Sequence, residues 1–141
     1  MNVAVLLLAA LAFDDPPRDV IDFFRQIAQA LADADRDMSV PAERNRPRHA
    51  TEFLGHFDKA MPGFDQFRSQ IEDMVGGGEV STNIDFINAA GNDKKRTLDL
   101  DWVLQCGGVA PKRAVIQCTI EKRGKKWKIT SIAPIEFFRR E

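Results

Sequence analysis

Hydrophobic residues follow two different periods along this chain, and the change comes near Gly78. Before that glycine, apolar side chains recur at spacings of three and four, which predicts amphipathic helices with one buried stripe. After it, apolar and polar side chains alternate, which predicts strands with one buried face. Helices followed by antiparallel strands are typical of an α+β domain, in which the helices cover the apolar face of the sheet.

Three helices are predicted in the first half. The first covers about residues 16–35, because Asp15-Pro16 is a helix-start signal. The second covers about residues 50–60, and the third covers residues 62–76, where three glycines end it. Residues 37–48 hold two prolines and three arginines, which favours a polar surface loop. The apolar stripes comprise Val20, Phe23, Phe24, Ile27, Leu31 and Ala34, then Phe53, Leu54 and Phe57, then Phe64, Phe67, Ile71 and Met74.

Four antiparallel strands are predicted in the second half. The first covers residues 80–86 and is followed by a turn over residues 88–95. The second covers residues 97–106 and the third residues 114–123. The fourth begins at Trp127. The predicted fold class is therefore three N-terminal helices packed on a four-stranded antiparallel sheet.

The alternation also assigns each strand two faces. Asp85, Asp99 and Asp101 fall on the face opposite the apolar one, which predicts that they are solvated. The phase of the fourth strand shifts near Ser131-Ile132, which indicates a β-bulge. The predicted inward side chains are Val80, Thr82, Ile84 and Phe86, then Leu98, Leu100, Trp102, Leu104 and Cys106, then Ala114, Ile116, Cys118 and Ile120.

The two cysteines are predicted to be buried free thiols. A symmetric hairpin would place Cys106 opposite Ala114 and Cys118 opposite Trp102. The cysteines would then lie four strand positions apart, or about 13 Å at the usual rise per residue. A disulfide requires Cα atoms within about 7 Å of each other, so no disulfide is expected.

The N-terminus has the pattern of an export signal. Residues 1–13 are apolar except Asn2, and Ala10-Leu11-Ala12 has the small-x-small form of a signal-peptidase site. The run is shorter than the roughly 20 residues that span a bilayer, so no stable membrane insertion is expected. Cleavage after Ala12 would leave one domain over residues 13–141, in the periplasm or outside the cell. No basic residue precedes the run, so the true start could lie upstream; the alternative is a buried N-terminal element of the domain.

Charge limits the classes of partner. The chain of 141 residues has 20 basic and 21 acidic residues, a net charge of −1, which argues against bulk binding to nucleic acid. A basic cluster lies near the C-terminus and has two interpretations, an anionic partner surface or a solvated hairpin tip; the second is favoured, since lysine discourages edge pairing of strands. The cluster comprises Lys122, Arg123, Lys125, Lys126 and Lys128, with Arg139 and Arg140.

Two segments carry a resemblance to a known group of proteins. They are Phe53-Leu54-Gly55-His56-Phe57-Asp58 and the closing strand Gly124-Lys-Lys-Trp127-Lys-Ile129-Thr-Ser-Ile132. With the order of elements, they resemble the NTF2-like superfamily, which includes ketosteroid isomerases, scytalone dehydratase and SnoaL-like cyclases. The resemblance covers about residues 19–138 and departs from the usual pattern in lacking an early β-hairpin between the second and third helices. It implies a cone of helices against a curved sheet around an apolar pocket.

The favoured function is an exported domain that binds a small apolar ligand, or serves an accessory role, without catalytic machinery. No ionisable residue falls on the inward face of the predicted strands, and no cofactor or metal is expected. The expected ligand contacts are Phe24, Phe57, Trp102, Leu104, Cys118 and Trp127.

The alternative is a SnoaL-like or isomerase-like enzyme acting on an apolar carbonyl compound. His56 is the candidate acid or base, with Asp58 nearby. The spacing of His49, Glu52 and His56 also allows a metal site, but a third zinc ligand with the usual spacing is not evident.

The outer face of the predicted sheet bears on assembly. Superfamily members resemble one another in dimerising through that face, but here it carries charged and amide side chains, with only Val103 and Val115 apolar. Because obligate interfaces are more hydrophobic, a monomer or weak homodimer is expected.

Overall fold

The computed structural model describes residues 16–32, 50–76, 79–107 and 109–139. The named elements follow in the order α2 (Arg18–Ala32), α4 (Phe64–Gly76), β1 (Val80–Gly91), β2 (Lys95–Cys106), β3 (Lys112–Arg123), β4 (Lys126–Ala133) and the 3-10 helix η1 (Ile135–Phe138). A further helical segment covers residues 50–54. This is the predicted α+β class, three helices against a four-stranded antiparallel sheet.

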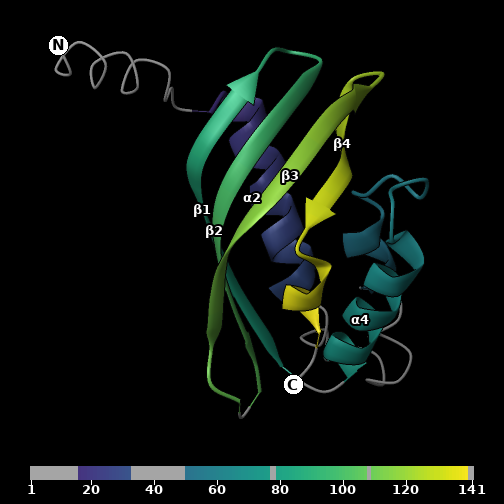
Figure 1. Cartoon of the computed structure of the whole chain (residues 1–141), viewed down its shortest axis with the longest axis vertical. Helices are drawn as coiled ribbons and strands as arrows, with labels where there is room; N and C mark the ends of the chain where they lie inside the picture. Colours follow the sequence, from purple (N-terminus) through teal and green to yellow (C-terminus); the bar gives the residue numbers. More distant parts are fainter. Residues whose placement is uncertain (1–15, 33–49, 77–78, 108, 140–141) are drawn as a thin grey trace, which may run out of the picture.

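The four strands pair in sequence order, β1-β2-β3-β4, through antiparallel hairpins. Figure 1 shows them bending strongly, with α2 on one side of the sheet and α4 beside the chain's C-terminal part. All predicted inward positions of β2 except Cys106 are buried, and so are Ile116, Cys118 and Ile120 of β3. Asp85 is exposed, and Asp99 and Asp101 are half-exposed on the opposite face, as predicted.

The first helix begins two residues later than predicted. Pro17 accepts hydrogen bonds from the backbone N–H groups of Val20 and Ile21, so its carbonyl opens α2. The predicted cap Asp15, the end at Asp35 and the loop over residues 37–48 lie outside the described residues. The predicted stripes are correct where they can be seen, since all the apolar positions of α2 and α4 named above, except the undescribed Ala34, are buried.

The second helical segment ends near Leu54, well before the predicted residue 60. Phe57 instead forms a parallel bridge with Ile129 of β4. The backbone N–H of Ile129 donates to the carbonyl of His56, and that of Asp58 donates to the carbonyl of Ile129. The helix therefore stops because the edge of β4 captures the chain that follows it.

The predicted register of the β2–β3 hairpin is wrong. Cys118 lies opposite Leu98, and Trp102 lies opposite Ala114. The turn lies two residues earlier in the chain than predicted, which places Cys106 beyond the ladder. The cysteines are then eight strand positions apart, roughly 26 Å. Both are free, as predicted, but only Cys118 is fully buried, and that burial raises the pKa of its thiol.

Two bulges set the shape of the sheet. In β4 the register shifts opposite Thr119 and Ile120, which leaves Thr130 as the extra residue, one position from the predicted bulge. The second bulge, at Ile87 of β1, was not predicted. It lets β1 continue to Gly91, through residues that the alternation assigned to a turn. An extra residue changes the phase of the side chains, which hides the continuing strand in the sequence.

Aromatic rings fill the space between the sheet and the helices. The ring of Phe138, from η1, packs edge-on against Trp102 of β2, with centroids 5.0 Å apart, and against Phe67 of α4 at 5.2 Å. Phe67 in turn contacts Phe57 at 4.7 Å, and Phe57 contacts Phe53 at 5.2 Å. All five side chains are at most 2% exposed. The C-terminal 3-10 helix therefore completes the core from inside the curve of the sheet.

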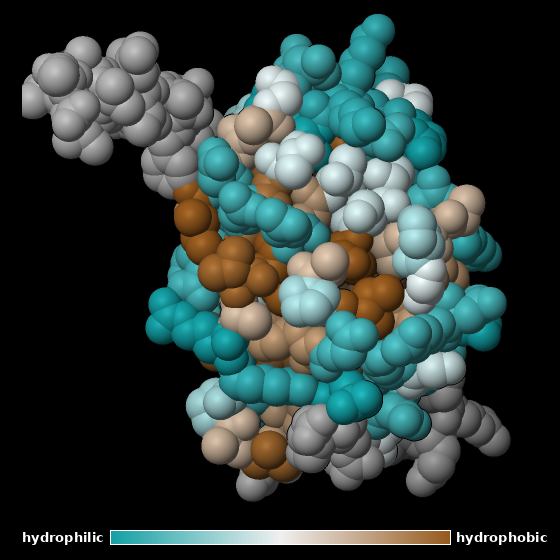
Figure 2. Space-filling view, viewed as in Figure 1, coloured by the Kyte–Doolittle hydropathy of each residue, from teal (hydrophilic) through white to brown (hydrophobic). Residues whose placement is uncertain are grey.

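The outer face of the sheet is mixed. Figure 2 shows hydrophobic side chains over the middle of that face and hydrophilic side chains toward both ends. Val115 is 56% exposed, and beside it Arg113 donates two hydrogen bonds, at 2.8 and 2.6 Å, to the carboxylate of Asp101. Within the described ranges, no helix is long and apolar enough to cross a membrane.

Truncating Phe138 tests the role of η1 in the core. The variant Phe138→Ala is expected to lower the free energy of unfolding by about 3–5 kcal/mol, because it removes a buried ring and leaves a cavity. Urea denaturation followed by circular dichroism measures the change. The control Val115→Ala, at an exposed position, is expected to change it by less than about 0.5 kcal/mol. Equal, small effects of the two substitutions would contradict the packing role of Phe138.

Candidate functional site

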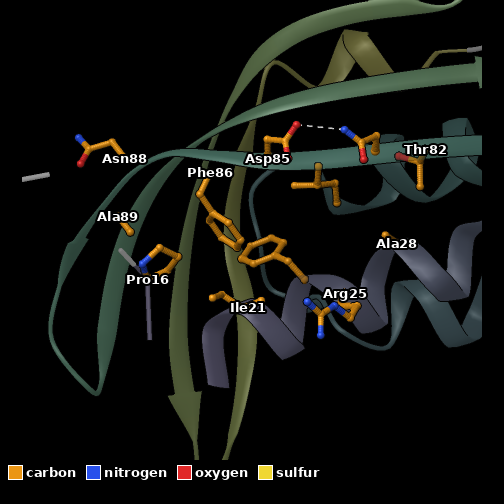
Figure 3. A pocket seen from close by; sticks show the side chains of 12 residues that line it. Pro16, Ile21, Arg25, Ala28, Thr82, Asp85, Phe86, Asn88 and Ala89 are labelled. Atoms are coloured by element: carbon orange, nitrogen blue, oxygen red, sulfur yellow. Dashed lines mark hydrogen bonds between the residues drawn. The ribbon is translucent and has the colours of Figure 1, made fainter. Parts of the chain in front are cut away.

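Two grooves flank α2. The first, which we call the edge groove, has a volume of about 590 Å³ and lies between α2 and β1, an edge strand of the sheet. In Figure 3 Phe86 points from β1 toward α2, whereas Asp85 points away from it. The apolar lining comprises Pro16, Ile21, Phe24, Ala28, Ile84, Phe86 and Ala89.

The walls of the edge groove are held by a few specific contacts. The rings of Phe24 and Phe86 meet edge to face with centroids 5.7 Å apart, which fixes α2 against β1. Thr82 Oγ1 accepts a hydrogen bond of 2.7 Å from Trp102 Nε1 and itself donates to the carbonyl of Val103 at 3.2 Å. The buried indole N–H is thereby satisfied, so the core and the groove wall are joined by one hydroxyl.

Polar groups are few and lie at the rim of the edge groove. Arg25, Asn83, Asp85 and Asn88 supply them. Asn83 donates a hydrogen bond of 3.1 Å to Asp85, while Arg25, among the described residues, makes one loose ion pair, with Asp22 at 3.7 Å. An apolar floor with a small number of polar groups is the usual composition of a small-molecule site.

The second groove, the hairpin groove, has a volume of about 840 Å³. It lies between α2, residues 52–56 and the β3–β4 hairpin. Trp127 Nε1 donates a hydrogen bond of 2.9 Å to Asp19 Oδ2, and the ammonium of Lys122 lies 3.5 Å from the same oxygen. That ammonium also lies 5.0 Å from the centre of the Trp127 ring. The hydrogen bond from Trp127 is the main cause that lowers the pKa of Asp19, so this carboxylate is charged and paired.

His56 faces the hairpin groove. Its ring meets Phe23 edge to face at 5.7 Å, and its side chain is half-buried. Burial is the main cause that lowers the pKa of His56; Lys128 and Lys126 lower it further, and Glu52 opposes them. Among the described residues, no group hydrogen-bonds to this imidazole. The lowered pKa of His56 favours its neutral form, and its ring nitrogens have no hydrogen-bond partner in the described part of the chain.

Asp58 does not accompany His56 in the groove. Its carboxylate accepts a hydrogen bond of 2.9 Å from Arg123 and one of 2.8 Å from the backbone N–H of Ala60. The bond from Ala60 is the first cause, and the bond from Arg123 the second, that lowers the pKa of Asp58. His56 therefore lines the hairpin groove, whereas Asp58 lies outside its lining and is held by Arg123 and Ala60.

Of the six predicted ligand contacts, two line a groove and four lie in the core. Phe24 lines the edge groove and Trp127 lines the hairpin groove. Phe57, Trp102, Leu104 and Cys118 line neither groove and lie in the core, each at most 2% exposed. Arg25, on one side of α2, was not predicted as a site residue; the four lysines on the other side belong to the basic cluster for which a solvated hairpin tip was favoured over an anionic partner surface. Periodicity identifies inward positions, but it does not distinguish a packed core from an open groove.

Of the three candidate metal ligands His49, Glu52 and His56, His49 lies outside the described residues. In the described ranges, no group of three His, Cys, Asp or Glu side chains could hold a metal ion.

No model of a protein family matches the sequence, and no curated protein matches it. Solved structures do match. Bd1075 of Bdellovibrio bacteriovorus superposes with a TM-score of 0.62 at 12% identity, over 82% of this chain and 38% of that one. This chain thus spans well under half the length of that protein.

Two structures match over most of both chains. An NTF-2 like protein of unknown function from Shewanella oneidensis has a TM-score of 0.58 at 11% identity, over 81% of this chain and 93% of that one. A putative scytalone dehydratase from Novosphingobium aromaticivorans has 0.56 at 13% identity, over 94% and 85%. At such identities, likeness establishes the fold alone. The protein therefore has the NTF2-like α+β fold.

Proposed function

We propose that this protein is an exported binding or accessory domain that takes a small apolar ligand in the edge groove. The observation that carries the proposal is the contrast between a core filled by its own rings and an open apolar groove beside it. A ligand cannot enter the core without displacing Phe138 or Phe67, whereas the edge groove is accessible between α2 and β1.

The size and lining of the edge groove support this function. Its volume of about 590 Å³ lies in the range of about 300–1,000 Å³ typical of small-molecule sites. Phe24 and Phe86 would contact the apolar body of the ligand. Arg25 and Asn88 would orient a polar substituent, since both are on the lining and the ion-pair partner of Arg25 within the described ranges, Asp22, lies 3.7 Å away.

The enzyme hypothesis keeps one specific observation in its favour. His56 is half-buried in the hairpin groove with a lowered pKa, so it could accept a proton from an apolar carbonyl compound. One of the solved structures with a similar fold is named a putative scytalone dehydratase, and this name supports an enzyme as the second candidate. Asp58 is committed to Arg123, so His56 would act without that carboxylate. We rank this second, because fold likeness does not assign chemistry.

Blocking the edge groove tests the binding function. The neutral fluorescent probe N-phenyl-1-naphthylamine is expected to bind the wild-type protein. Ala28→Gln is expected to raise the Kd of that probe at least tenfold, because the longer polar side chain occupies the apolar floor. Ala28 is half-exposed on a helix, so glutamine is tolerated there.

The matched control is Ala32→Gln, at the last residue of α2 and not on the groove lining. It is expected to leave the Kd within twofold of the wild-type value. Equal weakening by both substitutions, or none by either, would contradict binding in the edge groove.

Export has its own test. The full chain, produced in a bacterium with a periplasm, is expected in the periplasmic fraction. Its mass is expected to match a chain cleaved after Ala12, so that Phe13 is the first residue. Leu7→Arg is expected to retain it in the cytoplasm, because a charge interrupts the apolar run. Asp14→Asn, beyond the cleavage position, serves as the control. Recovery of the wild-type chain in the cytoplasm with Met1 retained would contradict export.

A further inference from the structure

The hairpin groove combines an apolar wall with a dense rim of cations. Lys122, Lys125, Lys126 and Lys128 come from one β-hairpin, and all four line the groove. The turn between them is tight, because Gly124 adopts a positive φ of 67°. The register pairs Lys122 with Trp127 and Arg123 with Lys126, so the two ends of the basic segment lie on neighbouring strands (Figure 1).

The acidic side chains of the groove do not neutralise this rim. Asp19 pairs with Trp127 and Lys122, and Asp22, which also lines the groove, is in an ion pair of 3.7 Å with Arg25. Glu52 then remains as the one carboxylate lining the groove, among the described residues, that has no ion-pair partner.

Three lysines face that single carboxylate. Within the described part of the chain, Lys125 and Lys126 have no ion-pair partner. Lys128 donates to the carbonyl of Gly55 and keeps further N–H donors. With four lysines against Asp19, Asp22 and Glu52, the lining of the groove has a surplus of about one positive charge.

Part of the lining is apolar, although Gln26 and Gln29 of α2 also line the groove. Phe23, which is 7% exposed, and Ala30, 9% exposed, come from α2, and Trp127, 6% exposed, comes from β4. His56 lies between the two kinds of surface, with its ring against Phe23 and the charges of Lys126 and Lys128 acting on it. A neutral imidazole carries one N–H donor, which suits an anionic oxygen.

We propose that the hairpin groove is a second binding site, for a small molecule that joins an apolar ring system to an anionic group. The anionic group lies between Lys126 and Lys128, with a hydrogen bond from His56. The apolar part covers Phe23 and Trp127. The site is separate from the edge groove, which lies across α2 from it, so the two proposals stand or fall independently.

A matched pair of probes tests the anionic requirement. 8-Anilinonaphthalene-1-sulfonate is N-phenyl-1-naphthylamine with one sulfonate added. Both probes are titrated into the Ala28→Gln protein, whose edge groove is blocked, with and without each further substitution, so that the ratio of their two Kd values reports the contribution of the charge at the hairpin groove. In the wild-type protein we expect the sulfonated probe to bind the hairpin groove. Lys126→Gln is expected to raise its Kd about fivefold, the effect of removing one charge near a groove surface. Lys126 is exposed and without an ion-pair partner in the described residues, so the fold is expected to persist.

Arg68→Gln is the control, since it removes one positive charge from α4, on a residue that lines neither groove. It is expected to leave the ratio of the two Kd values unchanged. An equal change in Lys126→Gln and Arg68→Gln would overturn the proposal, because net charge alone would then explain binding. No change in either would overturn it as well.

A third arm identifies what the groove recognises. Inorganic phosphate at 10 mM, with ionic strength held constant by sodium chloride, is expected to displace the sulfonated probe by less than twofold, because it lacks the apolar part. Full displacement by phosphate would overturn the mixed chemistry in favour of a bare anion site. His56→Gln, which keeps an N–H donor, is expected to retain binding within twofold, whereas His56→Leu is expected to weaken it.

Discussion

The edge-on contact between Trp102 and Phe138 is the constraint on which the rest of this structure depends. It holds the C-terminal 3-10 helix inside the curve of the sheet, with ring centroids 5.0 Å apart. Phe138 then continues the packing through Phe67 to Phe57, so that the sheet, α4 and the segment after the second helix share one aromatic core. Because protein interiors are close-packed, a core so filled has no room for a ligand.

The position of α2 follows from contacts on its two sides. Phe24 packs on Phe86 of β1, and Asp19 accepts a hydrogen bond from Trp127 of β4. The helix thus lies across the sheet from one edge strand to the other, and an aromatic side chain contributes to its contact with each. The edge groove and the hairpin groove are the spaces that remain on either side of it. Binding on this fold is therefore expected beside the helix, where side chains are half-exposed and backbone positions are fixed.

Much of the fold could be predicted from the sequence, and the failures have physical causes. Helical stripes and alternation identified most buried positions of α2, α4, β2 and β3, because burial imposes those periods on a chain. They did not identify Phe137 and Phe138 of η1, which are too few for a period to be recognised. The extension of β1 was missed, since the bulge at Ile87 reverses the alternation. The early end of the second helix was missed as well, because it depends on Ile129, more than seventy residues away. The site was predicted least well: Trp102 and Phe24 both fall on predicted buried faces and both are at most 2% exposed, but of the two only Phe24 also lines the edge groove.

The central claim is that ligands bind beside α2 and not within the aromatic core. Amide chemical shifts, measured by ¹⁵N–¹H NMR during titration with N-phenyl-1-naphthylamine, test it most directly. The account predicts that the largest shifts occur at Ile21, Ala28 and Ile84, on the two walls of the edge groove. Largest shifts at Leu104, Cys118 and the indole N–H of Trp102 would contradict it, because they would show that the core opens to admit the ligand.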